Sequence, residues 1–248
     1  MPKREPLPRN LPLTLLLNPP LTMVALLLIA VGCADRLSGT STTTENTIAG
    51  IAMLPAGGAA VGAEVVARSS VVLLTKDHVP TPQVLARTVA DTAGVFSLKL
   101  PPGTTRYYLE IRRIIPVDTS MGPAPVVSWL REFPTIDQKP AALGTVYLEP
   151  TSVVHGRLRP QGGEWNTRVW IGIAGTDGYH AILPVADTAG AEFTLADVPA
   201  GAGRLSLYVE PMIQIDQVDK PIPTDTVELV GIASGKVREV GTLPFQPR

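Results

Sequence analysis

Hydrophobic and polar side chains alternate along several short segments of this chain, and a period of two is the pattern of a half-buried β-strand. The clearest segments are 106–112, 168–174 and 204–210. In each of them, alternate residues are apolar or aromatic, while the residues between them are mostly charged, small or aromatic. The 3.6-residue period that would indicate helices is scarce. The pattern therefore predicts an all-β protein.

An internal repeat indicates how the strands are organised. The sequence Ala-Asp-Thr-Ala-Gly occurs at 90–94 and again at 186–190. Each copy leads into a short segment that contains phenylalanine, and then into a turn with proline and glycine at 101–103 or 199–201. A repeat with a spacing of about a hundred residues predicts two copies of one structural module.

The repeated residues have the chemistry of turns. An aspartate at the first corner of a turn accepts hydrogen bonds from backbone N–H groups two residues on, and glycine adopts a positive φ without steric cost. We therefore predict that these residues shape corners and take no part in catalysis. The predicted turn residues are Asp91, Gly94, Pro102 and Gly103 in the first copy, and Asp187, Gly190, Pro199 and Gly201 in the second.

Composition and spacing set the expected domain boundaries. Glycine and proline are abundant, at 22 and 25 residues, and turn signals recur at short intervals. We predict two tandem antiparallel β-sandwiches of about seven strands each, the first at 47–150 and the second at 151–248. Residues 33–46 are polar and rich in serine and threonine, so we predict that they form a flexible tether.

The N-terminal segment has the layout of an export signal. A basic start precedes an apolar run at 21–31, which ends in Gly32 and Cys33. As a helix, this run would be roughly 16 Å long, too short for the ~30 Å hydrocarbon layer of a bilayer. We predict that residues 1–32 are a signal peptide that is removed on export.

Cys33 is the single cysteine, so an intrachain disulfide is excluded. Together with Ala30, Val31 and Gly32 it resembles a bacterial lipobox, whose cysteine is acylated and becomes the first residue of the mature protein. The resemblance implies a lipoprotein held at the membrane by Cys33. Ala34 does not resemble the aspartate that retains some lipoproteins in the inner membrane. We therefore predict a cell-envelope protein anchored by lipid in the outer membrane, on its periplasmic or surface side. The alternative is a plain secretory signal in which Cys33 has no role.

Charge argues against a nucleic-acid partner. The whole chain has a net charge of −1. Residues 1–32 carry three positive charges and one negative charge, so the predicted mature chain would have a net charge of −3. Binding to nucleic acid requires a basic face, which this balance does not favour.

The order of strand, Asp-x-x-Gly turn, phenylalanine-containing strand and proline–glycine turn resembles the carboxypeptidase regulatory-like domain, a relative of the transthyretin-like sandwiches. The matching residues are Asp91, Gly94, Phe96, Pro102 and Gly103 in the first copy, and Asp187, Gly190, Phe193, Pro199 and Gly201 in the second. The resemblance covers nearly all of residues 47–248. It implies antiparallel sandwiches without catalytic residues of their own.

Catalytic and metal-binding alternatives have weaker support. Paired aspartic-protease loops place glycine directly after threonine, whereas Ala93 and Ala189 intervene here. The histidines, His78, His155 and His180, lack the spacing of metal ligands, and neither a nucleophile elbow nor a phosphate-binding loop occurs. The sequence therefore predicts a protein that is not an enzyme and needs no metal or cofactor.

Aromatic side chains are the remaining candidates. Alternation assigns Trp170, Tyr108 and Tyr208 to the strand faces that point away from the core. Exposed rings stack on sugars, so these three are candidate ligand-facing residues of a carbohydrate-binding protein; otherwise they pack under loops or against the neighbouring module. The main prediction is a non-catalytic envelope lipoprotein that acts as a structural, adhesion or protein-interaction module. Its expected partners are the membrane, through lipidated Cys33, and envelope proteins or polysaccharide.

Overall fold

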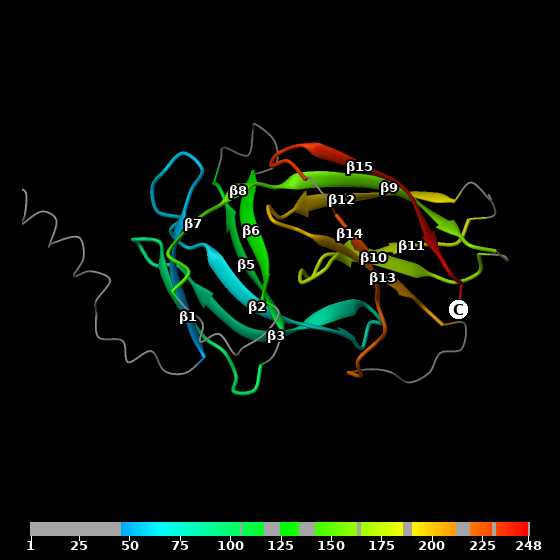
Figure 1. Cartoon of the computed structure of the whole chain (residues 1–248), viewed down its shortest axis with the longest axis horizontal. Helices are drawn as coiled ribbons and strands as arrows, with labels where there is room; N and C mark the ends of the chain where they lie inside the picture. Colours follow the sequence, from blue (N-terminus) through cyan, green and yellow to red (C-terminus); the bar gives the residue numbers. More distant parts are fainter. Residues whose placement is uncertain are drawn as a thin grey trace, which may run out of the picture. The chain divides into compact units, whose positions relative to one another are not determined.

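The computed structural model describes residues 46–104, 106–116, 125–133, 142–162, 165–185, 190–211, 219–229 and 232–247. They belong to one compact unit, Glu45–Arg248. The described residues form strands, turns and loops without a helix (Figure 1). The predicted all-β fold of sandwiched sheets is therefore confirmed. None of the described residues belongs to a helix long and apolar enough to cross a membrane.

The first half of this unit contains two sheets. Sheet A has the strand order β4-β1-β7, and sheet B has the order β3-β2-β5-β6-β8. Neighbouring strands are antiparallel except β1 and β7, which are parallel. The strands are β1 (Thr47–Met53), β2 (Glu64–Leu74), β3 (Pro80–Val89), β4 (Val95–Lys99), β5 (Tyr107–Ile114), β6 (Val126–Phe133), β7 (Thr145–Tyr147) and β8 (Glu149–Pro150).

The second half contains two further sheets. Sheet C has the order β12-β9-β15, and sheet D has the order β11-β10-β13-β14. Here too the neighbours are antiparallel except for one parallel pair, β9 and β15. The strands are β9 (Ser152–Pro160), β10 (Val169–Ile173), β11 (Tyr179–Ile182), β12 (Ala191–Val198), β13 (Arg204–Val209), β14 (Asp225–Glu228) and β15 (Val237–Phe245).

The two halves repeat one topology. In sheets A and C, the first strand of the half lies between its fourth strand and a late parallel strand. In sheets B and D, four strands follow the same order, β3-β2-β5-β6 in the first half and β11-β10-β13-β14 in the second, and sheet B has β8 in addition. The sequence repeat therefore corresponds to a duplicated arrangement of strands. Strand β8 ends at Pro150 and β9 begins at Ser152, close to the predicted boundary between the modules.

Each half has its own hydrophobic core. In each core, a phenylalanine ring occupies the space opposite a glycine. Gly50 pairs with Phe96 across β1 and β4, and Gly156 pairs with Phe193 across β9 and β12. A Cβ atom on Gly50 would lie 2.9 Å from the Phe96 ring, and one on Gly156 would lie 2.6 Å from the Phe193 ring. The missing side chain therefore makes room for the ring. Burying each ring contributes about 2–3 kcal/mol.

Strand β2 contains an irregularity in its pairing. It runs without interruption from Glu64 to Leu74. Its pairing with β3 shifts register on both sides of Arg68, so the break in alternation is a bulge inside one strand. Strand β3 begins at Pro80 and also includes Pro82. Prolines are tolerated in β3 because it is the edge strand of sheet B.

Candidate functional site

The predicted turn of the first copy is built by backbone hydrogen bonds. The Asp91 Oδ1 atom accepts hydrogen bonds from the N–H groups of Ala93, at 2.8 Å, and Val95, at 2.9 Å. Gly94 has a φ of 76°, and a Cβ atom on it would collide with the carbonyl oxygen of Ala52. Asp91 and Gly94 therefore shape the corner between β3 and β4.

The equivalent corner of the second copy has the same glycine geometry. Gly190 has a φ of 87°, and a Cβ atom on it would collide with the carbonyl oxygen of Leu158. Leu158 lies on β9 as Ala52 lies on β1, so the two glycines approach corresponding strands. Asp187 lies outside the described residues.

The proline–glycine turns differ between the copies. Gly103 has a φ of 77°, and a Cβ atom on it would have no neighbour within 4 Å. The Pro102–Gly103 turn is therefore open on that side. Gly201, with a φ of 81°, instead lies against the carbonyl group of Leu130 on β6. The carbonyl oxygen of Ala200, next to Pro199, accepts a hydrogen bond of 2.8 Å from the Leu130 N–H group. The turn of the second copy therefore docks on the first sandwich.

The prediction that three aromatic side chains face a ligand is wrong. Trp170 and Tyr108 are each only 8% exposed, and Tyr208 is 2% exposed. The three side chains do point away from the core of their own sandwich, as alternation predicted. The other sandwich, however, covers the faces on which they lie. Trp170 and Tyr208 pack in one cluster with Val72 and Leu74 of β2, and Tyr108 of β5 packs in the core cluster of the second half.

These contacts define a joint between the outward faces of sheets B and D. One apolar part consists of Val72, Leu74, Trp170, Tyr179, Tyr208 and Ile222. In a second part, Tyr108 and Leu130 of the first half join the core of the second half. The backbone of Gly175, on the loop after β10, leaves no room for a Cβ atom beside the Tyr108 ring. The joint is therefore closely packed.

A buried ion pair lies in the same joint. The Arg68 guanidinium donates to the Glu110 carboxylate at 2.5 Å and to the Asp177 carboxylate at 3.1 Å. Arg68 and Glu110 are 3% and 6% exposed, whereas the Asp177 side chain is largely exposed. Burial raises the pKa of Glu110 above its ordinary value, and the nearby Arg68 charge opposes this increase. Arg68 and Glu110 come from the first half and Asp177 from the second, so the cluster links the sandwiches.

Two further ionic contacts cross the joint at its rim. Glu132 accepts a hydrogen bond of 3.4 Å from Arg204 and also pairs with Arg106. Arg112 donates to Asp197 at 3.4 Å. Sequence reasoning did not identify these residues. The feature of the sequence that could have indicated them is the row of charged side chains on the outward faces of otherwise regular strands.

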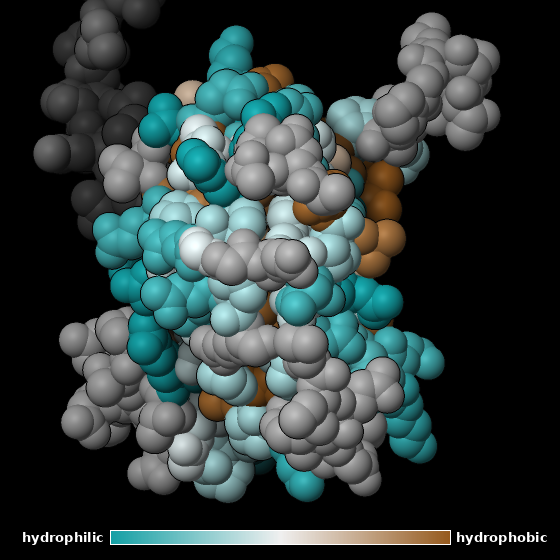
Figure 2. Space-filling view, turned by 90° about the vertical axis from the view of Figure 1, so that its right-hand side faces the viewer, coloured by the Kyte–Doolittle hydropathy of each residue, from teal (hydrophilic) through white to brown (hydrophobic). Residues whose placement is uncertain are grey.

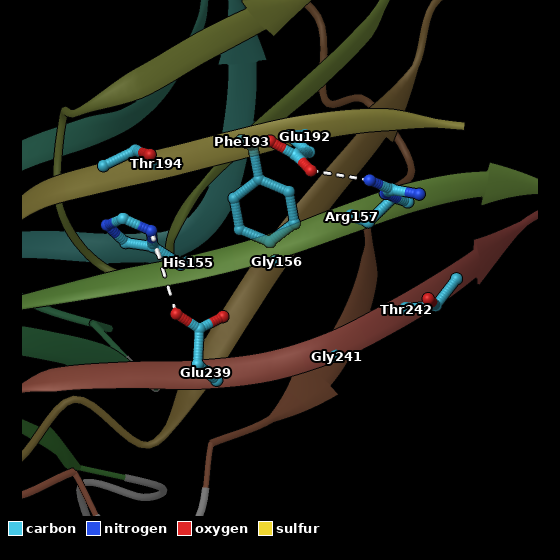
Figure 3. Close-up of a pocket in the computed structure, with 9 residues that line it drawn as sticks. All are labelled: His155, Gly156, Arg157, Glu192, Phe193, Thr194, Glu239, Gly241 and Thr242. Atoms are coloured by element: carbon cyan, nitrogen blue, oxygen red, sulfur yellow. Dashed lines mark hydrogen bonds and ion pairs between the residues drawn. The ribbon is translucent and has the colours of Figure 1, made fainter. Parts of the chain in front are cut away.

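A shallow polar hollow lies on the outward face of sheet C (Figure 3). His155 Nδ1 lies 3.8 Å from Glu239, and Arg157 donates to Glu192 at 2.6 Å. His155 and Arg157 therefore each face a carboxylate of a neighbouring strand. In the described part of the chain, His, Cys, Asp and Glu side chains do not gather in threes that could hold a metal ion. The molecular face in Figure 2 is mainly hydrophilic, with small separate hydrophobic patches.

The predicted lipidation site cannot be placed in this geometry. Cys33, the predicted signal peptide at 1–32 and most of the predicted tether lie outside the described residues. Lipidation of Cys33 therefore stays a prediction from sequence.

Comparisons with known proteins do not identify a family. No family model and no curated protein matches the chain. Among solved structures, it is similar to a double mutant of the shaft pilin SpaA from Lactobacillus rhamnosus GG, with 9% identity, a TM-score of 0.27, and coverage of 83% of this chain and 98% of the pilin. A streptococcal ancillary pilin gives 12% identity and a TM-score of 0.27, covering 82% of this chain and 63% of that chain.

A structure of another kind gives the same TM-score. The chain is similar to a 9R-lipoxygenase from Cyanothece PCC8801, with 15% identity and a TM-score of 0.27. That match covers 48% of this chain and only 20% of the lipoxygenase. Pilins and an enzyme thus have the same low TM-score, so function has to be argued from the residues of this chain.

Proposed function

We propose that this protein is a non-catalytic module of the cell envelope that acts in structure, adhesion or protein interaction. Lipidated Cys33 would anchor it in the outer membrane, and envelope proteins or polysaccharide would be its partners. The observation that carries this proposal is the joint. The side chains that alternation directs outward, where a ligand site would be expected, are used to bind one sandwich to the other.

The joint has the properties of a permanent connection. Its aromatic side chains are at least nine-tenths buried, and such rings contribute strongly to the energy of an interface. Its central ion pair is also buried, and separation of the sandwiches would break the contact between Arg68 and Asp177. Separation would also expose the buried aromatic rings to water, so the two sandwiches are expected to move as one body. A rigid pair of sandwiches suits a spacer or scaffold.

The carbohydrate-binding alternative loses its support. It depended on Trp170, Tyr108 and Tyr208, and all three rings are buried in the joint. A substitution such as Trp170→Ala would therefore disturb the joint and would not report on a sugar.

Metabolic labelling with a fatty-acid analogue tests the anchor. We expect label on the wild-type chain and none on Cys33→Ser, because the lipobox cysteine is the residue that carries the lipid. As a matched control, Cys33→Ser/Ser38→Cys keeps one thiol but moves it out of the lipobox, so it should also remain unlabelled. Membrane fractionation should recover the labelled protein with the outer membrane. Label on Cys33→Ser, or a wild-type chain without label, would contradict the proposal.

A further inference from the structure

The outward face of sheet A carries apolar side chains that are exposed or half-buried. The burial pattern of β4 and β7 alternates strictly, and that of β1 alternates except at the half-buried Gly50, whose strand partner is the buried Phe96, so inward and outward positions can be separated. The outward positions are Thr47, Ala49, Ile51 and Met53 on β1, Val95, Ser97 and Lys99 on β4, and Thr145 and Tyr147 on β7. We call these nine residues the A-face. Five of them are apolar or aromatic, one is a lysine, and none is a carboxylate.

Strand register brings the apolar side chains of the A-face together. Ile51 is paired directly with Val95 across β1 and β4, and Met53 is paired with Tyr147 across β1 and β7. Val95 is 43% exposed and Tyr147 is 59% exposed. Ile51 and Met53 are partly exposed and belong to none of the core clusters. Side chains paired in this way are in contact on one sheet surface, so they form one patch.

The duplicated fold supplies an internal comparison. Because Gly50 and Gly156 occupy equivalent positions, Ile51 corresponds to Arg157 and Val95 corresponds to Glu192. Arg157 and Glu192 form an ion pair of 2.6 Å on the outward face of sheet C (Figure 3).

A charged pair is therefore compatible with this fold at the position where the A-face has an apolar pair. The apolar A-face is not required by the architecture. Contiguous exposed apolar patches on soluble domains commonly mark a surface that binds something.

The chemistry of the A-face fits a phospholipid surface. Apolar side chains accompanied by an aromatic ring and a basic residue are typical of protein surfaces that lie in a membrane interface. Lys99 is the one charged residue of the A-face, and it has the sign that anionic headgroups attract. The absence of carboxylates from the A-face removes the main source of repulsion.

The connectivity of the chain also favours a membrane. Strand β1 is the middle strand of sheet A, and it begins 14 residues after Cys33. The intervening residues can span at most about 45 Å. Thr47, where the chain enters the sheet, is paired with Lys99, so the basic end of the A-face is the end attached to the tether. A short tether gives a high effective concentration of bilayer, which makes even weak association significant.

We propose that the A-face is a membrane-contact surface, through which the first sandwich binds phospholipid headgroups close to the lipid anchor at Cys33. The proposal rests on the proposed function in one respect, because lipidated Cys33 would hold the A-face near the bilayer. The contact itself uses the side chains of the A-face and can be measured without the lipid.

Vesicle co-sedimentation of an unlipidated chain tests the contact directly. The sample is residues 33–248 with Cys33→Ser, which contains the whole compact unit. The vesicles are phosphatidylethanolamine and phosphatidylglycerol at a ratio of about 3:1, titrated until binding saturates. We expect measurable partitioning, and a reduction of about tenfold when Ile51→Arg/Val95→Glu gives the A-face the ion pair that sheet C carries.

Two more variants make the result specific. Arg157→Glu/Glu192→Arg reverses the equivalent pair on sheet C, so it should fold and should partition like the parent chain. Tyr147→Ser removes an exposed ring without adding a charge, and it should lower partitioning several-fold. Thermal unfolding followed by circular dichroism shows whether each variant is folded.

Three outcomes would overturn the proposal. One is that the parent chain does not partition at any vesicle concentration. Another is that the parent, Ile51→Arg/Val95→Glu and Tyr147→Ser chains partition equally. The third is a dimer of the parent chain in sedimentation velocity that Ile51→Arg/Val95→Glu dissociates, because the A-face would then bind a second copy. Since Cys33 is absent from every sample, failure of the lipid anchor would appear only in the metabolic labelling.

Discussion

At the residue scale, single glycines and carboxylates determine where the chain turns. Gly94 and Gly190 both have positive φ and both lie against a carbonyl group of the first strand of their sandwich. Asp91 stabilises the same corner by accepting two backbone hydrogen bonds. Backbone geometry thus explains the Asp-x-x-Gly sequence of the first copy and the glycine of the second.

Substitution of Gly94 and of Gly103 distinguishes the cost of a steric collision from the cost of backbone strain. Gly94→Ala should lower the free energy of unfolding by about 3 kcal/mol, because it adds a collision with the Ala52 carbonyl to the cost of a positive φ. Gly103→Ala, with a nearly identical φ but open surroundings, should cost only about 1 kcal/mol. Urea unfolding measures both values. Equal costs would show that Gly94 does not approach β1 as described.

At the element scale, the outward faces of the strands could be assigned from sequence but their environment could not. The alternation at 106–112 correctly separates Tyr107, which lies in the first core, from Tyr108, which does not. A strand pattern shows that two faces differ, but it does not show what covers the second face. Tyr108 and Trp170 therefore appeared to be exposed, while in the folded chain each is covered by the other sandwich or its neighbouring loops.

The ion pair between β2 and β5 gives a prediction at this scale. Arg68→Ala should lower the free energy of unfolding by about 3–5 kcal/mol, because it leaves the buried Glu110 carboxylate without its partner. Replacement of both groups, as in Arg68→Met/Glu110→Leu, should cost about 1 kcal/mol or less, since no buried charge remains unpaired. Chemical unfolding followed by tryptophan fluorescence provides the comparison. A double variant as unstable as Arg68→Ala would contradict this explanation.

The same pair predicts a pH dependence. Burial raises the pKa of Glu110 in the folded state, so the folded state holds its proton more tightly than the unfolded state does. This contribution to stability is present below the ordinary pKa and is lost as pH rises through the raised value. Glu110→Gln removes the titration. Its free energy of unfolding should therefore increase relative to wild type as the pH rises above 4.5. A difference that stays constant or falls with pH would contradict the raised pKa.

At the scale of the whole molecule, the repeat in the sequence predicted the duplication but not how the copies associate. Gly50 and Gly156, each opposite a phenylalanine, show that the two halves are built alike. The association depends on contacts that only one copy makes, such as the contact of Asp177 with Arg68 and the hydrogen bond between Ala200 and β6. Contacts formed by one copy only leave no periodic signal, so a single sequence does not reveal them.

The duplicated strand order is the central claim, and cross-strand NOEs in the isotopically labelled chain, residues 33–248, test it most directly. The parallel pairs are the most distinctive feature. Contacts are expected between Ile51 and Thr145 in sheet A, and between Arg157 and Thr242 in sheet C. Finding both would establish the same topology in each half. If β7 or β15 instead paired antiparallel, or with a different strand, the two halves would not be copies of one sandwich.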